Sequence, residues 1–128
     1  MDCIFCKIIK GELPSKTLYE NDKVKVILDI DPFSSGHCLV LPKEHIQDID
    51  TIDDDTLLEV FSVAKIIKKQ IIEKLNVDGC TFIENNGYGQ AIKHFHLHIV
   101  PRVVDDGMEI LRDKHGVKSA DEVFELMQ

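Results

Sequence analysis

Three histidines, His94, His96 and His98, alternate with apolar residues in one short stretch of the chain. Because successive side chains of a strand point to opposite faces, the three imidazoles would share one face, and the intervening Phe, Leu and Ile side chains would share the other. In a helix, only the first and third histidines would be neighbours. Glycines before the stretch, a proline after it and its aromatic and β-branched residues favour a strand. A single histidine is most simply a half-buried packed residue, but three on one face indicate a site.

A row of imidazoles has two natural chemical uses. Neutral ring nitrogens ligate metals, and one ring can act as a nucleophile while its neighbours bind the substrate or donate protons. Cys3 and Cys6 form a CxxC pair, which together with His45 and His94 makes a Cys2His2 set suited to structural zinc. That assignment leaves His96 and the histidine after it free for catalysis. The residues alone leave the alternatives open: the CxxC pair could be packing, and His45 an exposed loop residue.

The loop Asn85–Gln90 comes just before the histidines and contains Gly87 and Gly89. Glycines permit positive φ and close approach of the backbone to a ligand, so N–H groups and side-chain amides of this loop could hold phosphate oxygens. Lys and Arg are scarce nearby. Neutral donors and one histidine cation would therefore have to stabilise developing negative charge. The alternative is an ordinary turn.

Composition limits the class of protein. The 128 residues are 44% hydrophobic and 30% charged, which is typical of one globular domain, and the net charge of -8 with a pI near 5.1 argues against nucleic-acid binding through a basic surface. No stretch approaches the ~18 apolar residues that a membrane span needs, and the first residues lack the pattern of a secretion signal. We expect a cytoplasmic protein with no membrane partner and with its four cysteines reduced.

Hydrophobic periodicity predicts an α+β fold, a five-stranded antiparallel sheet with one long helix and short terminal helices. The single domain covers residues 1–128, with a core at about 3–102 and a tail at 103–128 that ends in a short helix capped by Ser119. The predicted strands are 17–20, 24–29, 37–42, 80–84 and 95–100, and the predicted helices are 5–10, 53–75 and 119–127.

The histidine stretch resembles the His-φ-His-φ-His-φ-φ signature of the histidine-triad family of nucleotide hydrolases and transferases, in which φ is an apolar residue. Other motifs of that family follow in the same order over residues 3 to about 102. They are Cys3-Ile4-Phe5-Cys6 with Gly11-Glu12-Leu13-Pro14, Leu28-Asp29-Ile30-Asp31-Pro32, Gly36-His37, Pro42-Lys43-Glu44-His45, Asn85-Asn86-Gly87 and Gly89-Gln90.

This resemblance implies an enzyme that cleaves purine nucleotides at the α-phosphate through a covalent nucleotidyl-histidine. His96 corresponds to the nucleophile, and the phosphate-binding partners are His98 and Asn85, with Gln90 nearby and His37 in support. Asp29 matches the carboxylate that binds the ribose. The apolar walls of the purine pocket would be Ile4, Phe5, Ile8, Ile27, Ile30 and Leu39, which core packing explains equally well.

The resemblance implies a homodimer, joined through the long helix and an edge strand into a ten-stranded sheet. It also favours structural zinc on Cys3, Cys6, His45 and His94, as in a bacterial zinc-carrying branch, and it indicates no organic cofactor. The expected substrate is an adenosine 5′-monophosphoramidate. Two departures bear on this: the loop before the histidines is shorter than the common pattern, and Ala91 stands where many members carry a hydroxyl residue.

Three other functions remain open at this point. The first is hydrolysis of dinucleoside polyphosphates by the same chemistry. The second is a nucleotide-binding or regulatory protein whose hydrolysis is incidental. The third is a metalloenzyme that uses His96 and His98 as ligands of an open zinc ion.

Overall fold

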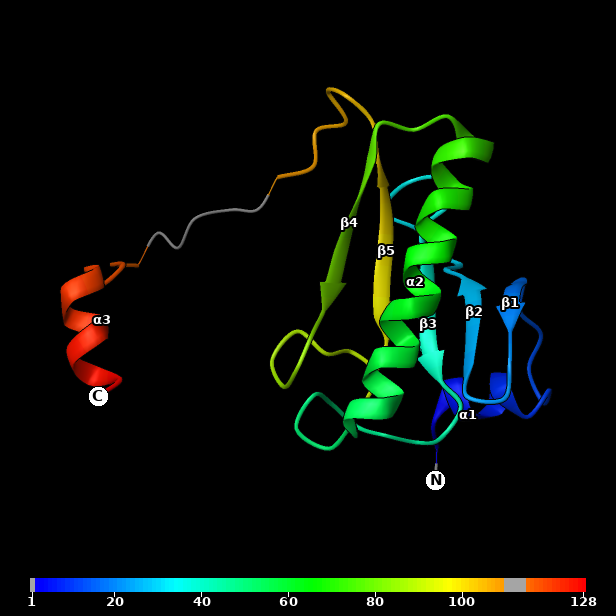
Figure 1. Ribbon diagram of the computed structural model, residues 1–128, viewed down its shortest axis with the longest axis horizontal. Coiled ribbons are helices and arrows are strands. Elements are labelled where there is room, and N and C mark those ends of the chain that lie inside the picture. The colour runs from blue at the N-terminus through cyan, green and yellow to red at the C-terminus, as the bar shows by residue number, and fades with distance from the viewer. Residues whose placement is uncertain (1, 110–114) are drawn as a thin grey trace.

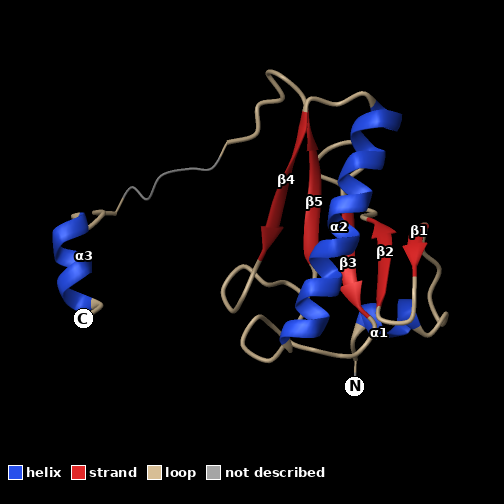
Figure 2. Cartoon of the chain, viewed as in Figure 1, coloured by secondary structure: helices blue, strands red, loops and turns tan. Residues whose placement is uncertain are grey.

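The computed structural model describes residues 2–109 and 115–128 and contains one antiparallel sheet with the strand order β1-β2-β3-β5-β4. Helix α2 crosses one face of this sheet (Figure 1 and Figure 2). The predicted α+β class and five-stranded antiparallel sheet are therefore confirmed. The elements in chain order are α1 (Ile4–Ile9), β1 (Thr17–Glu20), β2 (Val24–Leu28), β3 (Cys38–Pro42), α2 (Asp54–Leu75), β4 (Gly79–Glu84), β5 (Leu97–Arg102) and α3 (Ala120–Leu126).

Helix α2 has clear start and stop signals. The Asp53 side chain accepts a hydrogen bond from the backbone N–H of Thr56, and Asn76 ends the helix in the left-handed conformation with φ 54°. The apolar side of the helix packs on the sheet, as its periodicity predicts. Phe61 and Leu75 share this periodicity but are 40% and 48% exposed: the Phe61 ring lies against Phe82 of β4, and the Leu75 side chain lies beside Gly36. The helix residues buried in the core are Val60, Val63, Ala64, Ile67 and Ile71.

The two faces of the sheet carry separate clusters. Phe95, Leu97 and Ile99 lie in the larger cluster with the buried residues of α2, so they occupy the helix side. His94 and His96 are buried as well, but Phe5 of α1 packs against both of them. The second cluster contains Cys3, Phe5, Ile27, Leu39 and Leu41. The alternation expected from the sequence therefore holds, with apolar side chains on one face and imidazoles on the other.

Strand β5 begins and ends two residues later than the sequence predicts. Proline at the end of β3 explains the late start, because Pro42 has no N–H with which to continue the ladder. The N–H of Phe95 instead bonds to the carbonyl of Ile46 at 2.6 Å. Of the three histidines, only His98 is therefore within a strand, and the other two occupy the segment leading into it.

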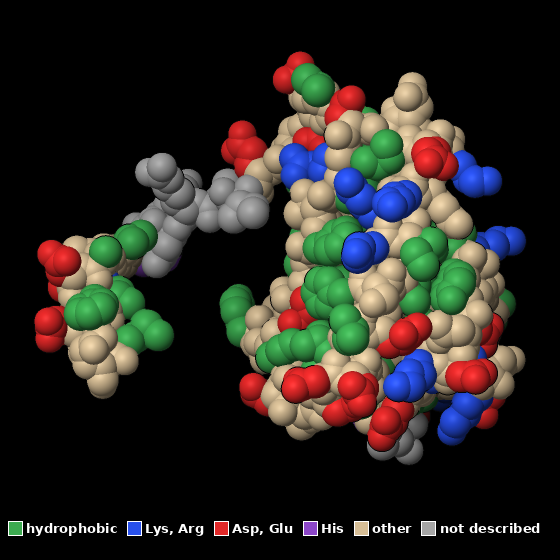
Figure 3. Space-filling view, viewed as in Figure 1, with side chains coloured by type: hydrophobic (Ala, Val, Ile, Leu, Met, Phe, Trp, Pro, Cys, Tyr) green, Lys and Arg blue, Asp and Glu red, His purple; other side chains and the backbone are tan. Residues whose placement is uncertain are grey.

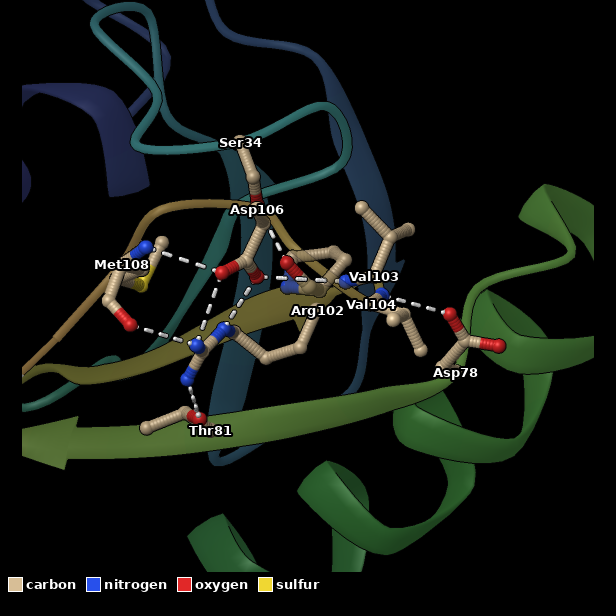
Figure 4. A network of polar contacts seen from close by, with 9 residues as sticks. Ser34, Asp78, Thr81, Arg102, Val103, Val104, Asp106 and Met108 are labelled. Atoms are coloured by element: carbon tan, nitrogen blue, oxygen red, sulfur yellow. Dashed lines mark hydrogen bonds and ion pairs between the residues drawn. The ribbon is translucent and has the colours of Figure 1, made fainter.

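The far end of β5 continues through a proline that was predicted to stop it. Pro101 lies beyond the last β3 partner and pairs only with Cys80 of β4, so no β3 ladder bond is lost. Arg102 then holds the following turn through two bonds to Asp106, with Nε–Oδ2 at 2.6 Å and Nη2–Oδ1 at 3.0 Å, and a bond to Thr81 (Figure 4). This ion pair keeps the pKa of the Asp106 carboxyl below its usual range.

The C-terminal helix α3 is separate from the sheet in this structure (Figure 1). Ser119 and Glu122 form a capping box at its start, which confirms the predicted cap, and none of its residues is buried. Within the part of the chain that the structure describes, no helix has the length and apolar character needed to span a bilayer.

Candidate active site and metal cluster

The four predicted metal ligands come together at the base of the histidine segment. Cys3 precedes α1 and Cys6 lies within it, while His45 follows β3 and His94 precedes β5. Their donor atoms all lie within 4.8 Å of one another. The Sγ atoms of Cys3 and Cys6 are 3.4 and 3.6 Å from Nδ1 of His94, and Sγ of Cys6 is 3.2 Å from Nδ1 of His45.

These distances fit a tetrahedral ion with two sulfur and two nitrogen ligands. Bond lengths of roughly 2.3 Å to sulfur and 2.0 Å to nitrogen place neighbouring ligand atoms roughly 3.3–3.8 Å apart. His94 is also oriented correctly, because its Nε2–H donates to the carbonyl of Pro42 at 2.8 Å and leaves the Nδ1 lone pair toward the sulfurs. Burial, and then the neighbouring Cys3, raise the pKa of the Cys6 thiol. A dipositive ion would reverse that shift by favouring the thiolates.

His96 has one ring nitrogen fixed by the backbone. Its Nδ1 lies 2.7 Å from the carbonyl oxygen of His94. A carbonyl can only accept, so Nδ1 carries the hydrogen, and the lone pair of the neutral ring is on Nε2. The Phe5 ring packs edge-on against the imidazole with a centroid separation of 5.1 Å. The nitrogen of His96 that remains free of the backbone is therefore Nε2.

His37 and His98 are hydrogen-bonded to each other and lie on the other side of His96. Nε2 of His37 lies 2.9 Å from Nδ1 of His98 and 3.6 Å from Oδ2 of Asp29. Nδ1 of His37 accepts the backbone N–H of Phe33 at 3.0 Å, so its hydrogen is on Nε2. His98 must then accept at Nδ1 and carry its own hydrogen on Nε2. The rings of His96 and His98 are neighbours, with centroids 4.9 Å apart.

Burial favours the neutral form of His37, His94 and His98. Desolvation lowers the pKa of His98 to about 4, and the adjacent His96 and His37 add to the shift. The pKa of His37 is lowered by burial, although the Asp29 carboxylate opposes the change, and burial also lowers the pKa of His94. Neutral rings can present a lone pair or a hydrogen-bond donor, whereas imidazolium can only donate.

The geometry gives little support to a catalytic metal on the triad histidines. Asp29, His37 and His98 do converge within 4.8 Å. However, the 2.9 Å separation of the two imidazole nitrogens is a hydrogen-bond distance, shorter than two ligands of one ion usually approach, and the structure brings His96 into neither cluster of potential ligands among the described residues.

The predicted purine-pocket residues fall into two groups. Phe5, Ile27 and Leu39 are buried in the second cluster, and Ile8 packs against it. Ile30 is 96% exposed and lies outside that cluster. Ile4 is 46% exposed. The assignment of these side chains to a purine pocket stays a prediction.

The predicted phosphate loop has the backbone conformation that its glycines indicate. Gly87 and Gly89 have φ of 75° and 95°. Gln90 is buried, and its Nε2 donates to the carbonyl of Gln47 at 2.6 Å, while its Oε1 has no partner among the described residues. Asn85 is half-buried, with its amide oxygen beside Gly89. Roles for Asn85 and Gln90 in binding phosphate stay predictions.

Two contributors to the site were missed in the sequence. The first is the carbonyl of Pro42, which orients His94, and no property of a side chain signals it. The second is Phe33, whose ring packs on both His37 and His98. Its place in the stretch 31–36, which is rich in turn-forming residues and lies just before His37, was the available signal.

Comparison with known proteins identifies the family. The model of the HIT domain matches residues 10–104. This chain belongs to the HIT family. An uncharacterized HIT-like protein of Methanocaldococcus jannaschii is 45% identical over 109 residues, covering 82% of each chain. The adenosine 5′-monophosphoramidase HNT1 of Candida albicans is 39% identical over 106 residues, covering 78% of this chain and 70% of that one.

Solved HIT structures share the fold. A HIT family protein from Bacillus anthracis superposes with a TM-score of 0.87 at 36% identity, covering 98% of this chain and 92% of that one. A zinc-bound histidine triad family protein from Mycobacterium smegmatis has a TM-score of 0.81 at 37% identity, covering 89% of this chain and 84% of that one. The resemblance stated from the sequence motifs is therefore confirmed.

The lowered pKa of His98 predicts a stability change with pH. The unfolded chain takes up a proton near the ordinary pKa of 6.5, whereas folded His98 resists protonation until about pH 4. The stabilising contribution is therefore complete above pH 6.5 and is lost as the pH falls toward 4. Urea unfolding across this range should show a smaller pH dependence in His98→Asn than in the wild type. An unchanged pH dependence would contradict the assignment.

Proposed function

We propose that this HIT protein hydrolyses purine nucleotides at the α-phosphate, with adenosine 5′-monophosphoramidates as its substrates and His96 as the nucleophile. The observation that carries the proposal is the 2.7 Å bond from Nδ1 of His96 to the carbonyl of His94, which leaves Nε2 as the free base. The similarity to a relative named adenosine 5′-monophosphoramidase supports the choice of substrate.

The first chemical step forms a covalent intermediate. Nε2 of His96 attacks the α-phosphorus, a phosphorus–nitrogen bond to the ring forms, and the bond from phosphorus to the leaving amine breaks. The amine takes the bonding electron pair and a proton from water. The modified ring becomes cationic, and the carbonyl of His94 stabilises it through the retained Nδ1–H.

The second step restores the enzyme. Water attacks the phosphorus, loses a proton to solvent, and the bond to Nε2 breaks with its electron pair returning to His96. The neutral Nε2–H of His98 donates to a phosphate oxygen in both steps, and His37 holds that ring through Nδ1. We assign phosphate contacts to Asn85 and Gln90, and the ribose hydroxyls to Asp29.

Replacing the nucleophile tests the chemistry directly. In His96→Gly, kcat for an adenosine phosphoramidate should fall by at least ~10³-fold, since the side chain assigned to form the covalent bond is removed. AMP binding, measured by calorimetry, should persist. Phe124→Ala, which changes an exposed ring of α3, serves as the control and should retain wild-type turnover.

Intact-mass spectrometry of the wild type under rapid quench should show one added nucleotidyl group, which peptide mapping places on His96. Wild-type turnover in His96→Gly, or a nucleotidyl group on another residue, would refute the proposal. Turnover of diadenosine polyphosphates far above that of phosphoramidates would retain the mechanism and replace the substrate. Tight mononucleotide binding with negligible turnover of either would show a binding protein.

We also propose that Cys3, Cys6, His45 and His94 hold a structural zinc ion. The tetrahedral spacing of their donor atoms and the zinc-bound HIT structure from Mycobacterium smegmatis support this assignment. When bound, zinc supplies a rigid link between α1 and the segment that carries His96 rather than a reactive water. The carbonyl of His94 would thereby be held at the position in which it orients the nucleophile.

Metal analysis separates a structural from a catalytic ion. Protein purified in zinc-containing buffer should hold about one zinc per chain, and Cys3→Ser should lose it because a thiolate ligand is removed, while hydrolysis is partly retained. Cys80→Ser changes a free cysteine outside the cluster and should keep the metal. Absence of zinc from the wild type, or complete loss of chemistry in Cys3→Ser with the fold intact, would contradict this role.

We propose a homodimer in which two β4 edges meet. β4 is at the end of the strand order, so one of its sides has no partner strand among the described residues. Phe82 of β4 and Phe61 of α2 form an exposed pair, with centroids 6.4 Å apart and 38% and 40% of their surfaces exposed. Hydrophobic side chains gather over α2 and β4 on this face (Figure 3).

The free cysteines and the acidic net charge further support a cytoplasmic protein with no nucleic-acid partner.

A charge placed in this apolar face should weaken the dimer. Phe82→Asp is expected to shift the mass measured by light scattering from dimer to monomer, because the carboxylate would be buried without a partner. Val104→Asp, at an exposed turn, is the matched control and should remain dimeric. A monomeric wild type would contradict the proposal, as would a Phe82→Asp variant that stays fully dimeric.

A further inference from the structure

The side chain of Phe33 is not explained by core packing. It is 61% exposed, although a Phe ring gains most from burial. Its ring lies parallel to that of His98, with an interplanar angle of 8° and centroids 6.0 Å apart. The same ring contacts His37 at a centroid distance of 4.7 Å. An aromatic ring left mostly in solvent thus covers one side of the bonded histidine pair.

The backbone of Phe33 acts on the same pair. Its N–H donates to Nδ1 of His37 at 3.0 Å, which places the hydrogen of His37 on Nε2. That hydrogen is directed at Nδ1 of His98, so the hydrogen of His98 is on Nε2. The tautomers of two successive rings therefore follow from one backbone amide. Were His37 to carry its hydrogen on Nδ1 instead, it could not donate to His98.

The turn that carries Phe33 is held from several sides. Asp29 accepts the N–H of Asp31 at 2.9 Å, and the N–H of His37 donates to the carbonyl of Ser34 at 3.1 Å. Ser34 Oγ donates to the carbonyl of Pro101 in β5 at 2.7 Å (Figure 4). Because His98 is in β5 as well, the ring and the histidine it covers are fixed to the same strand.

We propose that Phe33 is a positioning residue for the reaction assigned to this site. Its amide selects the tautomer of His37 and through it that of His98, and its ring holds the His98 imidazole in the plane from which Nε2–H points at the phosphate. Phe33 contacts neither the phosphorus nor the leaving group. This inference depends on the proposed hydrolysis for its kinetic consequence, but the tautomers depend on the fold alone.

Three substitutions separate the contributions of ring and amide. Phe33→Tyr keeps both, and because the ring is largely exposed its kcat should remain within about twofold of the wild type. Phe33→Ala loses the ring and keeps the amide; kcat should fall about tenfold with KM within about twofold, since a donor to the transition state is misaligned rather than removed. Phe33→Pro also loses the N–H, and its kcat should fall further.

Nitrogen-15 NMR of the imidazoles provides a readout that a purely structural role would not change. The wild type should show His37 and His98 with hydrogen on Nε2. Phe33→Ala should retain that assignment for His37, whereas Phe33→Pro should show a mixture of tautomers. If Phe33→Pro does not fold, the wild-type tautomers and the kinetics of the other two variants still decide the matter. Phe124 is similarly exposed at 64%, and Phe124→Ala should change neither reading.

Wild-type kcat in Phe33→Ala would overturn the role of the ring, and so would a rise in KM with kcat unchanged, which would make Phe33 a substrate contact. Hydrogen on Nδ1 of His37 or of His98 in the wild type would overturn the role of the amide. Absence of His96-dependent hydrolysis in the wild type would instead overturn the proposed function, and the tautomers would still test the placement of Phe33.

Discussion

Burial of Phe95, Leu97 and Ile99 against α2 is the constraint on which the site depends. Each of these side chains is at most 1% exposed, and burying a large apolar side chain is worth roughly 1.5–3 kcal/mol. A shift of one residue would exchange the apolar and histidine faces and would place imidazoles in the core without partners. The fold therefore sets the direction of the histidines before any metal or nucleotide binds.

Hydrogen bonds to backbone carbonyls and amides then fix which ring nitrogen of each histidine carries the hydrogen. The carbonyl of Pro42 accepts a hydrogen bond from Nε2–H of His94, so that ring presents Nδ1 to the cysteines. The carbonyl of His94 accepts a hydrogen bond from Nδ1–H of His96, so that ring leaves Nε2 free. One peptide unit thus joins the proposed metal cluster to the proposed nucleophile. Disturbing the cluster would displace the carbonyl that orients the base without touching the reacting atoms.

Sequence patterns predicted much of this arrangement because local rules decide it. Alternation predicted the faces of residues 94–99, and helical periodicity predicted a helix over 53–75, where α2 lies. The start of β5 was wrong because it depends on a proline in β3, a strand distant in the sequence. Phe61 also fits the helix period, yet it is 40% exposed and lies against Phe82 of the edge strand β4.

Residue types and the family resemblance also suggested the Cys2His2 set, and the fold brings its members together across as many as 91 sequence positions. The tautomers could not be predicted, since the groups that set them are backbone atoms of Phe33, Pro42 and His94. Backbone partners of this kind cannot be recognised from the residue types in the sequence. They become visible only when the distances between ring nitrogens and backbone atoms are known.

A crystal structure of this HIT protein with bound AMP tests the roles proposed for the histidines most directly. It should show the phosphorus facing Nε2 of His96 and a phosphate oxygen within hydrogen-bond distance of Nε2 of His98, with Nδ1 of His96 still bonded to the carbonyl of His94. A phosphate bound elsewhere on the chain, or a His96 ring turned so that Nε2 faces the apolar side, would contradict the account.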